Sequence, residues 1–143
     1  MGTGKCDVIA STSIKHMVSA LLEKHNRTGV HLATNAIRLS NGQYGAIAHL
    51  VRAPNHYTQC TYIFSSVHPF VIPHVCRSPF HLPNSSSFPI EQYHASFAVG
   101  LMYVDGKIVV SYSILDSISN FVVTDKAELF GNMVEVSFHR ILI

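Results

Sequence analysis

Three polar side chains stand where a β-rich chain can present chemistry to a ligand. His49 closes the apolar run YGAIAH, Tyr57 follows in the next segment, and Asp116 ends the run KIVVSYSIL. A carboxylate can accept hydrogen bonds from two hydroxyl groups, and an imidazole or phenol can form a hydrogen bond with a polar ligand. Sheets hold the groups at their strand ends rigidly. We therefore take these three as candidate binding residues. The alternative for Asp116 is a turn residue whose carboxylate bonds the adjacent backbone.

Other chemistries lack the residue spacing that they need. The chain has ten histidines and three cysteines, but no H-E-x-x-H motif and no Cys and His pairs at zinc spacing, so we predict no metal and no cofactor. The sequence GTGK at residues 2–5 is half a phosphate-binding loop, without a preceding strand and with Cys6 in place of the hydroxyl. Cys60 and Cys76 lie in apolar runs, where we expect inert thiols rather than nucleophiles.

Composition limits the classes of partner. Of the 143 residues, 48% are hydrophobic and 13% charged, with a net charge of +2. That length suits one domain, and so little charge indicates that some apolar surface meets a partner or more chain. The scattered basic residues argue against nucleic-acid binding. No run is long enough to cross a membrane, no secretory signal precedes the domain, and three cysteines favour a reducing compartment. These features predict a cytoplasmic protein.

The elements that must position the candidates differ between the two ends of the chain. Residues 1–28 form a tail and one amphipathic helix at 13–24, because apolar residues recur there at helical spacing. Residues 29–143 carry strand signals throughout, with two hairpin turns at Asn41-Gly42 and Asp105-Gly106. We expect a loop around Tyr57, a long irregular connection at 78–92, one helical turn at 125–130 and a last strand from 133 to the end.

This pattern of about eight short strands predicts a mainly β, antiparallel protein. Two architectures remain open: hairpins arranged like the blades of a β-propeller, or a small β-sandwich.

The order of these segments resembles a carbohydrate-active family, the five-bladed β-propeller proteins that include the β-mannoside phosphorylases. A related group carries the same propeller beside glycosyltransferase domains. The resemblance covers residues 30–125 and is best in the stretch SFAVGLMYVDGKIVVSYSILD. The residues that match the family pattern are Ile37, Gly42, His49, Tyr57, Pro69, Arg77, Pro79, Phe97, Gly100, Asp105, Gly106, Tyr112 and Asp116.

The resemblance implies roles for the three candidates. The family's His and Tyr hold phosphate or sugar near the propeller axis, and its Asp lies at the sugar site; these roles fall on His49, Tyr57 and Asp116. The family's general acid and most of its phosphate-binding residues lie upstream of the matched region. Ser113 also stands where the family usually has Gly. Residues 29–143 amount to about two blades, which cannot close a ring.

The sequence therefore predicts a module that binds a glycan or sugar phosphate and is not catalytic by itself. It would be a fragment of a larger parent chain, part of a homo-oligomer, or a shortened relative. The alternative is a protein-interaction module that uses exposed strand edges and the apolar C-terminal segment FHRILI.

Overall fold

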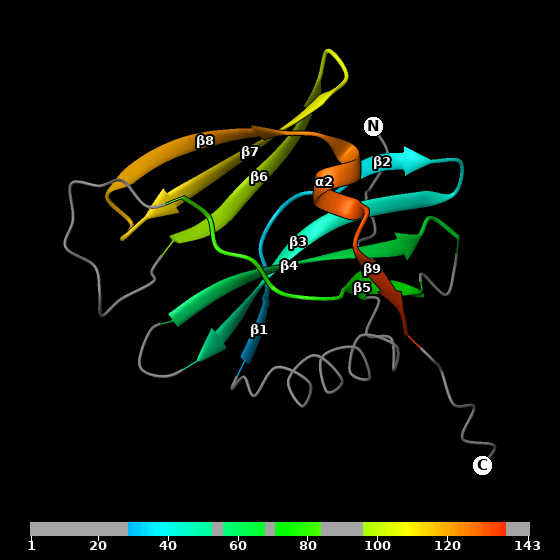
Figure 1. Cartoon of the computed structure of the whole chain (residues 1–143), viewed down its shortest axis with the longest axis horizontal. Coiled ribbons are helices and arrows are strands. Elements are labelled where there is room, and N and C mark those ends of the chain that lie inside the picture. Colours follow the sequence, from blue (N-terminus) through cyan, green and yellow to red (C-terminus); the bar gives the residue numbers. More distant parts are fainter. Residues whose placement is uncertain (1–28, 53–55, 68–70, 84–95, 137–143) are drawn as a thin grey trace, which may run out of the picture.

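The computed structural model describes residues 29–52, 56–67, 71–83 and 96–136. Two antiparallel β-sheets make up most of this part of the chain (Figure 1). The predicted helix at 13–24, most of the connection at 78–92 and the segment FHRILI lie outside the described residues, as do GTGK and Pro69. Within the described residues, no helix has the length and apolar character needed to cross a membrane.

The larger sheet has six strands and is built around a long central hairpin. That hairpin consists of β3 (Gln43–Arg52) and β4 (His56–Ser65). Two short strands, β1 (Gly29–Leu32) and β2 (Ile37–Ser40), both pair with β3, at opposite halves of its length. On the other side, β4 pairs with β5 (His74–Cys76), and β5 pairs with β9 (Met133–Glu135). The sheet thus joins the first and last described strands.

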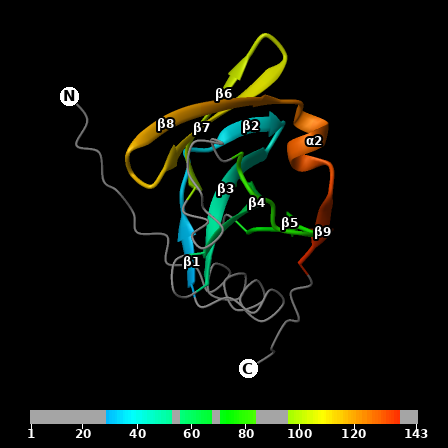
Figure 2. The ribbon, with the colours of Figure 1, turned by 60° about the vertical axis from the view of Figure 1, so that its left-hand side comes forward.

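The smaller sheet is a three-stranded meander of β6 (Ser96–Val104), β7 (Lys107–Ile114) and β8 (Ile118–Thr124). A short helix, α2 (Lys126–Phe130), follows β8 and leads the chain back to β9. Figure 2 shows β8 arching over the central hairpin, with α2 at its end and β9 descending beside β5. This sheet is therefore inserted, in chain order, between two strands that are neighbours in the larger sheet.

Alternating apolar residues fill the space between the two sheets. In β7 every second residue is buried and faces the larger sheet, from Ile108 to Ile114. Ile47 on β3 belongs to the same core, whereas its neighbours Ala46 and Ala48 belong to a second core on the opposite face. This period of two is what a strand with two covered faces requires.

Close packing of α2 depends on one glycine. A Cβ atom added at Gly45 on β3 would lie 2.6 Å from the ring of Phe130, which is buried at the end of α2. Any side chain at this position would have to displace that ring. Gly45 therefore lets the helix seat against the central hairpin.

The predicted class is confirmed: the protein is mainly β, with antiparallel sheets. Both predicted hairpin turns are present, with Gly42 at φ 81° and the Asp105-Gly106 pair at φ 48° and 80°. The helical turn after β8 is also present, as α2. In the described residues the sheets have six and three strands, whereas a propeller blade has four. The two sheets pack on the core that contains Ile47 and the buried residues of β7.

Two local predictions are wrong. Tyr57 lies within β4 rather than in a loop, because the hairpin with β3 extends to the pair Arg52 and His56. The run from 30 to 39 forms two strands rather than one. The break between them is at Asn35, whose side chain donates to the Leu101 carbonyl at 2.9 Å and accepts from the Leu101 N–H at 2.9 Å. This polar side chain thus takes the place of a strand partner for β6.

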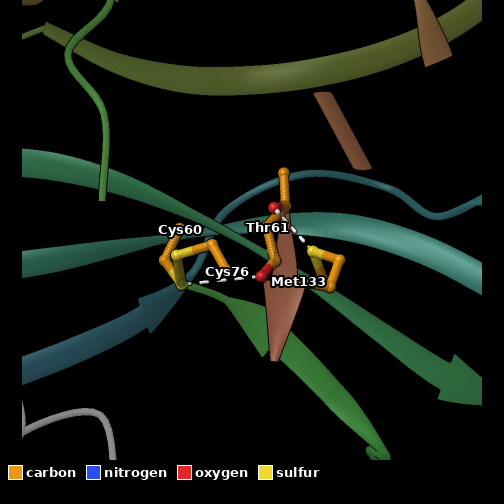
Figure 3. The surroundings of a disulfide bond; sticks show 4 residues. All are labelled: Cys60, Thr61, Cys76 and Met133. Atoms are coloured by element: carbon orange, nitrogen blue, oxygen red, sulfur yellow. Dashed lines mark hydrogen bonds between the residues drawn. A yellow bond between two sulfur atoms is a disulfide. The ribbon is translucent and has the colours of Figure 1, made fainter. Parts of the chain in front are cut away.

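The prediction of inert thiols at Cys60 and Cys76 is also wrong. These residues form a disulfide that joins β4 to β5, with Cα atoms 5.6 Å apart (Figure 3). Both residues are almost completely buried, at 0% and 3% exposure. Since disulfides persist mainly in oxidising compartments, the expected cytoplasmic location loses the support it drew from free cysteines.

Candidate functional site

His49 and Tyr57, two of the three predicted binding residues, lie together. They stand on adjacent strands, β3 and β4, and their ring centroids are 6.0 Å apart in an edge-to-face arrangement. Both are half-buried. The long hairpin brings them onto the same face because His49 pairs with Gln59, two residues along β4 from Tyr57.

Two further rings complete a cluster that the sequence did not reveal. Phe97 of β6 lies 5.5 Å from His49 and 6.0 Å from Tyr57, measured between ring centroids. His31 of β1 is exposed and lies 6.1 Å from His49. We call His31, His49, Tyr57 and Phe97 the ring cluster. It draws on three strands of the larger sheet and one of the smaller.

Gln59 holds the smaller sheet in place beside this cluster. Its side chain is fully buried, donates to the Ser96 carbonyl at 2.8 Å and accepts from the Ala98 N–H at 3.2 Å. The amide therefore satisfies backbone groups on both sides of Phe97, as a neighbouring strand would. Gln59 thus helps to position Phe97 against His49.

The His49 imidazole favours its neutral form. Burial lowers its pKa below the ordinary 6.5, the nearby His31 lowers it further by charge repulsion, and the hydrogen bond with Gln59 opposes both effects. Within the described part of the chain, its Nδ1 atom is buried and has no hydrogen-bond partner. The neutral ring thus adds an uncharged, half-buried surface beside Tyr57 and Phe97.

Asp116 lies at the same end of the molecule but does not contact the ring cluster. It follows Ile114, which pairs with Ser96, the residue whose carbonyl Gln59 holds. Its side chain is exposed, and its backbone has φ 55° in the turn between β7 and β8. Among the described residues, no hydrogen bond or ion pair engages its carboxylate; the turn is closed instead by the Ser117 N–H, which donates to the Ile114 carbonyl at 3.0 Å.

Three residues around His49 were not predicted from the sequence, and they differ in how far the sequence could have indicated them. Phe97 matches the family pattern, but the resemblance implies no role for it. His31 precedes the Asn41-Gly42 turn by ten residues and reaches His49 through the pairing of β1 with β3. Nothing in the sequence marked Gln59, because a buried amide is recognised only from the groups around it.

The arrangement offers ring faces, a neutral imidazole and, in the adjoining turn, a carboxylate. Such groups bind hydroxyl-rich or planar ligands, since aromatic faces meet apolar ligand surface and polar atoms fix orientation.

In the described residues, no group of three or more His, Cys, Asp or Glu side chains is placed to hold a metal ion. Comparisons of the chain with protein-family models, curated proteins and solved structures find no match.

Proposed function

We propose that this chain binds carbohydrate at the ring cluster, with Asp116 contacting the sugar from the adjoining turn, and does not catalyse a reaction by itself. The observation that carries the proposal is the convergence of His49, Tyr57 and Phe97 from separate strands into one half-buried patch. The apolar face of a sugar ring packs on aromatic rings, and its hydroxyl groups bond to imidazole and carboxylate.

Neutral glycans suit the cluster better than sugar phosphates. Phosphate is held by cationic groups, Arg above all. The ring cluster contains no Lys or Arg, and burial disfavours the charged form of His49. The family resemblance, with roles at His49, Tyr57 and Asp116, points to a β-mannoside or a related glycan.

Binding without catalysis follows from the chemistry that glycoside cleavage needs. Both hydrolysis and phosphorolysis require a positioned proton donor as well as a second acidic or anionic group. The residues that match the family do not include its general acid. Asp116 is then a binding carboxylate, and any catalytic role would need acid groups supplied by a larger parent chain or by a second subunit.

The test is a titration of the full chain with β-mannosides of two to four sugar units, followed by calorimetry. Tyr57→Leu removes a ring face and Asp116→Asn removes a charged acceptor, so each should weaken binding by about tenfold. Asp105→Asn is the matched control, since Asp105 is an exposed aspartate with positive φ in the other tight turn of the same sheet. Its affinity should equal that of the wild type. Equal loss in all three variants, or no binding of any tested glycan, would refute the proposal.

A second candidate function is association with another copy of the chain. The outer face of the smaller sheet exposes Val99, Met102, Phe121 and Val123, at 53% to 70% of their surfaces. Large exposed apolar patches commonly mark interaction sites, and a self-complementary patch of this kind can meet the same patch on a second copy. Light scattering on the titrated samples would reveal such a dimer, and its mass should not respond to Tyr57→Leu.

A further inference from the structure

A cavity of about 420 Å³ opens between the two sheets, away from the ring cluster. Its walls come from β7, β8 and α2 on one side and from the segment at 76–83 with β4 on the other. This volume lies within the range of sites that enclose small organic molecules. The cavity shares no residue with the ring cluster, so it is a separate candidate site.

Most of the cavity wall is apolar. Phe80 and Leu82 line it from the segment that follows β5, Val110 and Val122 from the smaller sheet, and Leu129 from α2. Leu82 and Val110 are almost fully buried, at 5% and 1% exposure. These side chains would accept the hydrocarbon body of a ligand.

One nearly buried polar group in the wall has unused acceptor capacity. Thr61 is 1% exposed, and its hydroxyl donates to the Met133 sulfur at 3.5 Å (Figure 3). A thioether is a weak acceptor, and the arrangement leaves the lone pairs of the Thr61 oxygen without a donor among the described residues. A ligand that fits here should therefore bring a hydrogen-bond donor.

The titratable groups of the cavity wall are one carboxylate, Glu128, and one imidazole, His81. Glu128 of α2 lines the cavity, with one carboxylate oxygen accepting from the Thr124 hydroxyl at 2.6 Å. Neither Lys nor Arg is among the lining residues. Arg77 lies between the lining residues Cys76 and Ser78 but is exposed and does not itself line the cavity. Lys107 pairs with Asp125 at 2.7 Å, and Lys126 donates to the Leu39 carbonyl.

We propose that this cavity binds a small organic cation in which an apolar body carries an ammonium group. An ammonium has only donors, so it matches the two acceptors, Glu128 and Thr61, and its charge complements the carboxylate. The apolar body fills the remaining wall. This activity is additional to the proposed glycan binding and uses none of its residues.

The test compares two probes with the same phenyl body and opposite charge, phenethylamine and phenylacetate, by amide NMR on the full chain. Phenethylamine should shift the amides of Val110, Val122 and Leu129 and saturate, while phenylacetate should not. Glu128→Gln should weaken phenethylamine by about tenfold, and Thr61→Val by a smaller factor.

Glu135→Gln is the control, because it removes an exposed carboxylate on β9 that does not line the cavity. It should leave the phenethylamine affinity unchanged. Glu128 is exposed, so its substitution does not threaten folding. The proposal is overturned if phenylacetate binds as tightly as phenethylamine, if the shifts avoid the cavity, or if Glu128→Gln and Glu135→Gln have the same effect.

Discussion

At the scale of single residues, His49 and Gln59 link the candidate site to the stability of the fold. Gln59 supplies the buried hydrogen bonds that hold β6 on β4, and its cross-strand partner His49 packs against the ring that β6 carries. Substituting either residue should therefore alter the packing of both sheets. This coupling also makes the site sensitive to the protonation of His49.

Stability should fall as the solution is acidified through the histidine range. Because the folded-state pKa of His49 is below its ordinary value of 6.5, the unfolded chain binds this proton more readily than the folded chain does. The contribution of neutral His49 is fully present above about pH 7 and is lost as the pH falls through 6.5 towards the folded-state pKa. Urea unfolding at a series of pH values measures this loss.

His49→Phe keeps an aromatic ring and removes the titration, so it should reduce the slope of unfolding free energy against pH. His31→Gln removes only the smallest of the three influences on His49, so most of the slope should persist. A His49→Phe variant with the slope of the wild type would show that burial does not perturb this histidine.

At the scale of elements, the turn between β7 and β8 contains an unfavourable residue. Leu115 and Asp116 have φ 52° and 55°. Positive φ at two successive residues suits the right-handed twist of hairpins, but it is normally met by Asn, Asp or Gly. Asp116 fits this preference, whereas a leucine side chain crowds the following carbonyl.

Leu115→Asn should therefore stabilise the protein by about 1 kcal/mol, since Asn tolerates this conformation and Leu115 is partly exposed. Thermal unfolding gives the measurement. Leu32→Asn, an exposed leucine in β1 with ordinary strand backbone, is the control and should give no gain. If both substitutions had the same effect, surface polarity rather than turn geometry would explain it.

Elements with local signals could be predicted from the sequence, whereas pairings between distant residues could not. The two glycine-containing turns and α2 depend on neighbouring residues, and they lie where expected. The break at Asn35 depends on Leu101, and the cluster at His49 depends on His31 and Phe97. The contact between His49 and Tyr57 was not predicted, because a loop was expected around Tyr57, whereas β4 places it diagonally across from His49. The contact of Asp116 with a sugar stays a prediction.

At the scale of the whole molecule, the disulfide between Cys60 and Cys76 ties together the two halves of the larger sheet. It closes a loop with a sequence separation of 16 and is buried in the core that includes Tyr62 and Val75. Such a link stabilises the folded protein chiefly by restricting the unfolded chain. Its effect should therefore appear in any measurement of global unfolding.

Replacing both cysteines with alanine should lower the free energy of unfolding by about 3 kcal/mol, the value for a loop of this length. Adding reductant during denaturant unfolding should lower the wild-type value similarly and leave the double variant unchanged. Cys6→Ala, which removes the remaining cysteine, is the control and should behave as the wild type. If reductant destabilises neither protein, Cys60 and Cys76 are thiols in solution.

The placement of β9 beside β5 suggests the order in which the strand pairings form. The hairpin of β3 and β4 and the meander of β6 to β8 each join strands that follow one another closely, so each can form early at a small cost in chain entropy. We expect the pairing of His74 with Glu135 to form after the meander, because a compact meander brings β9 back to β5. The ladder between β5 and β9, the most distant strand pairing among the described residues, should therefore close last and lock the two sheets together.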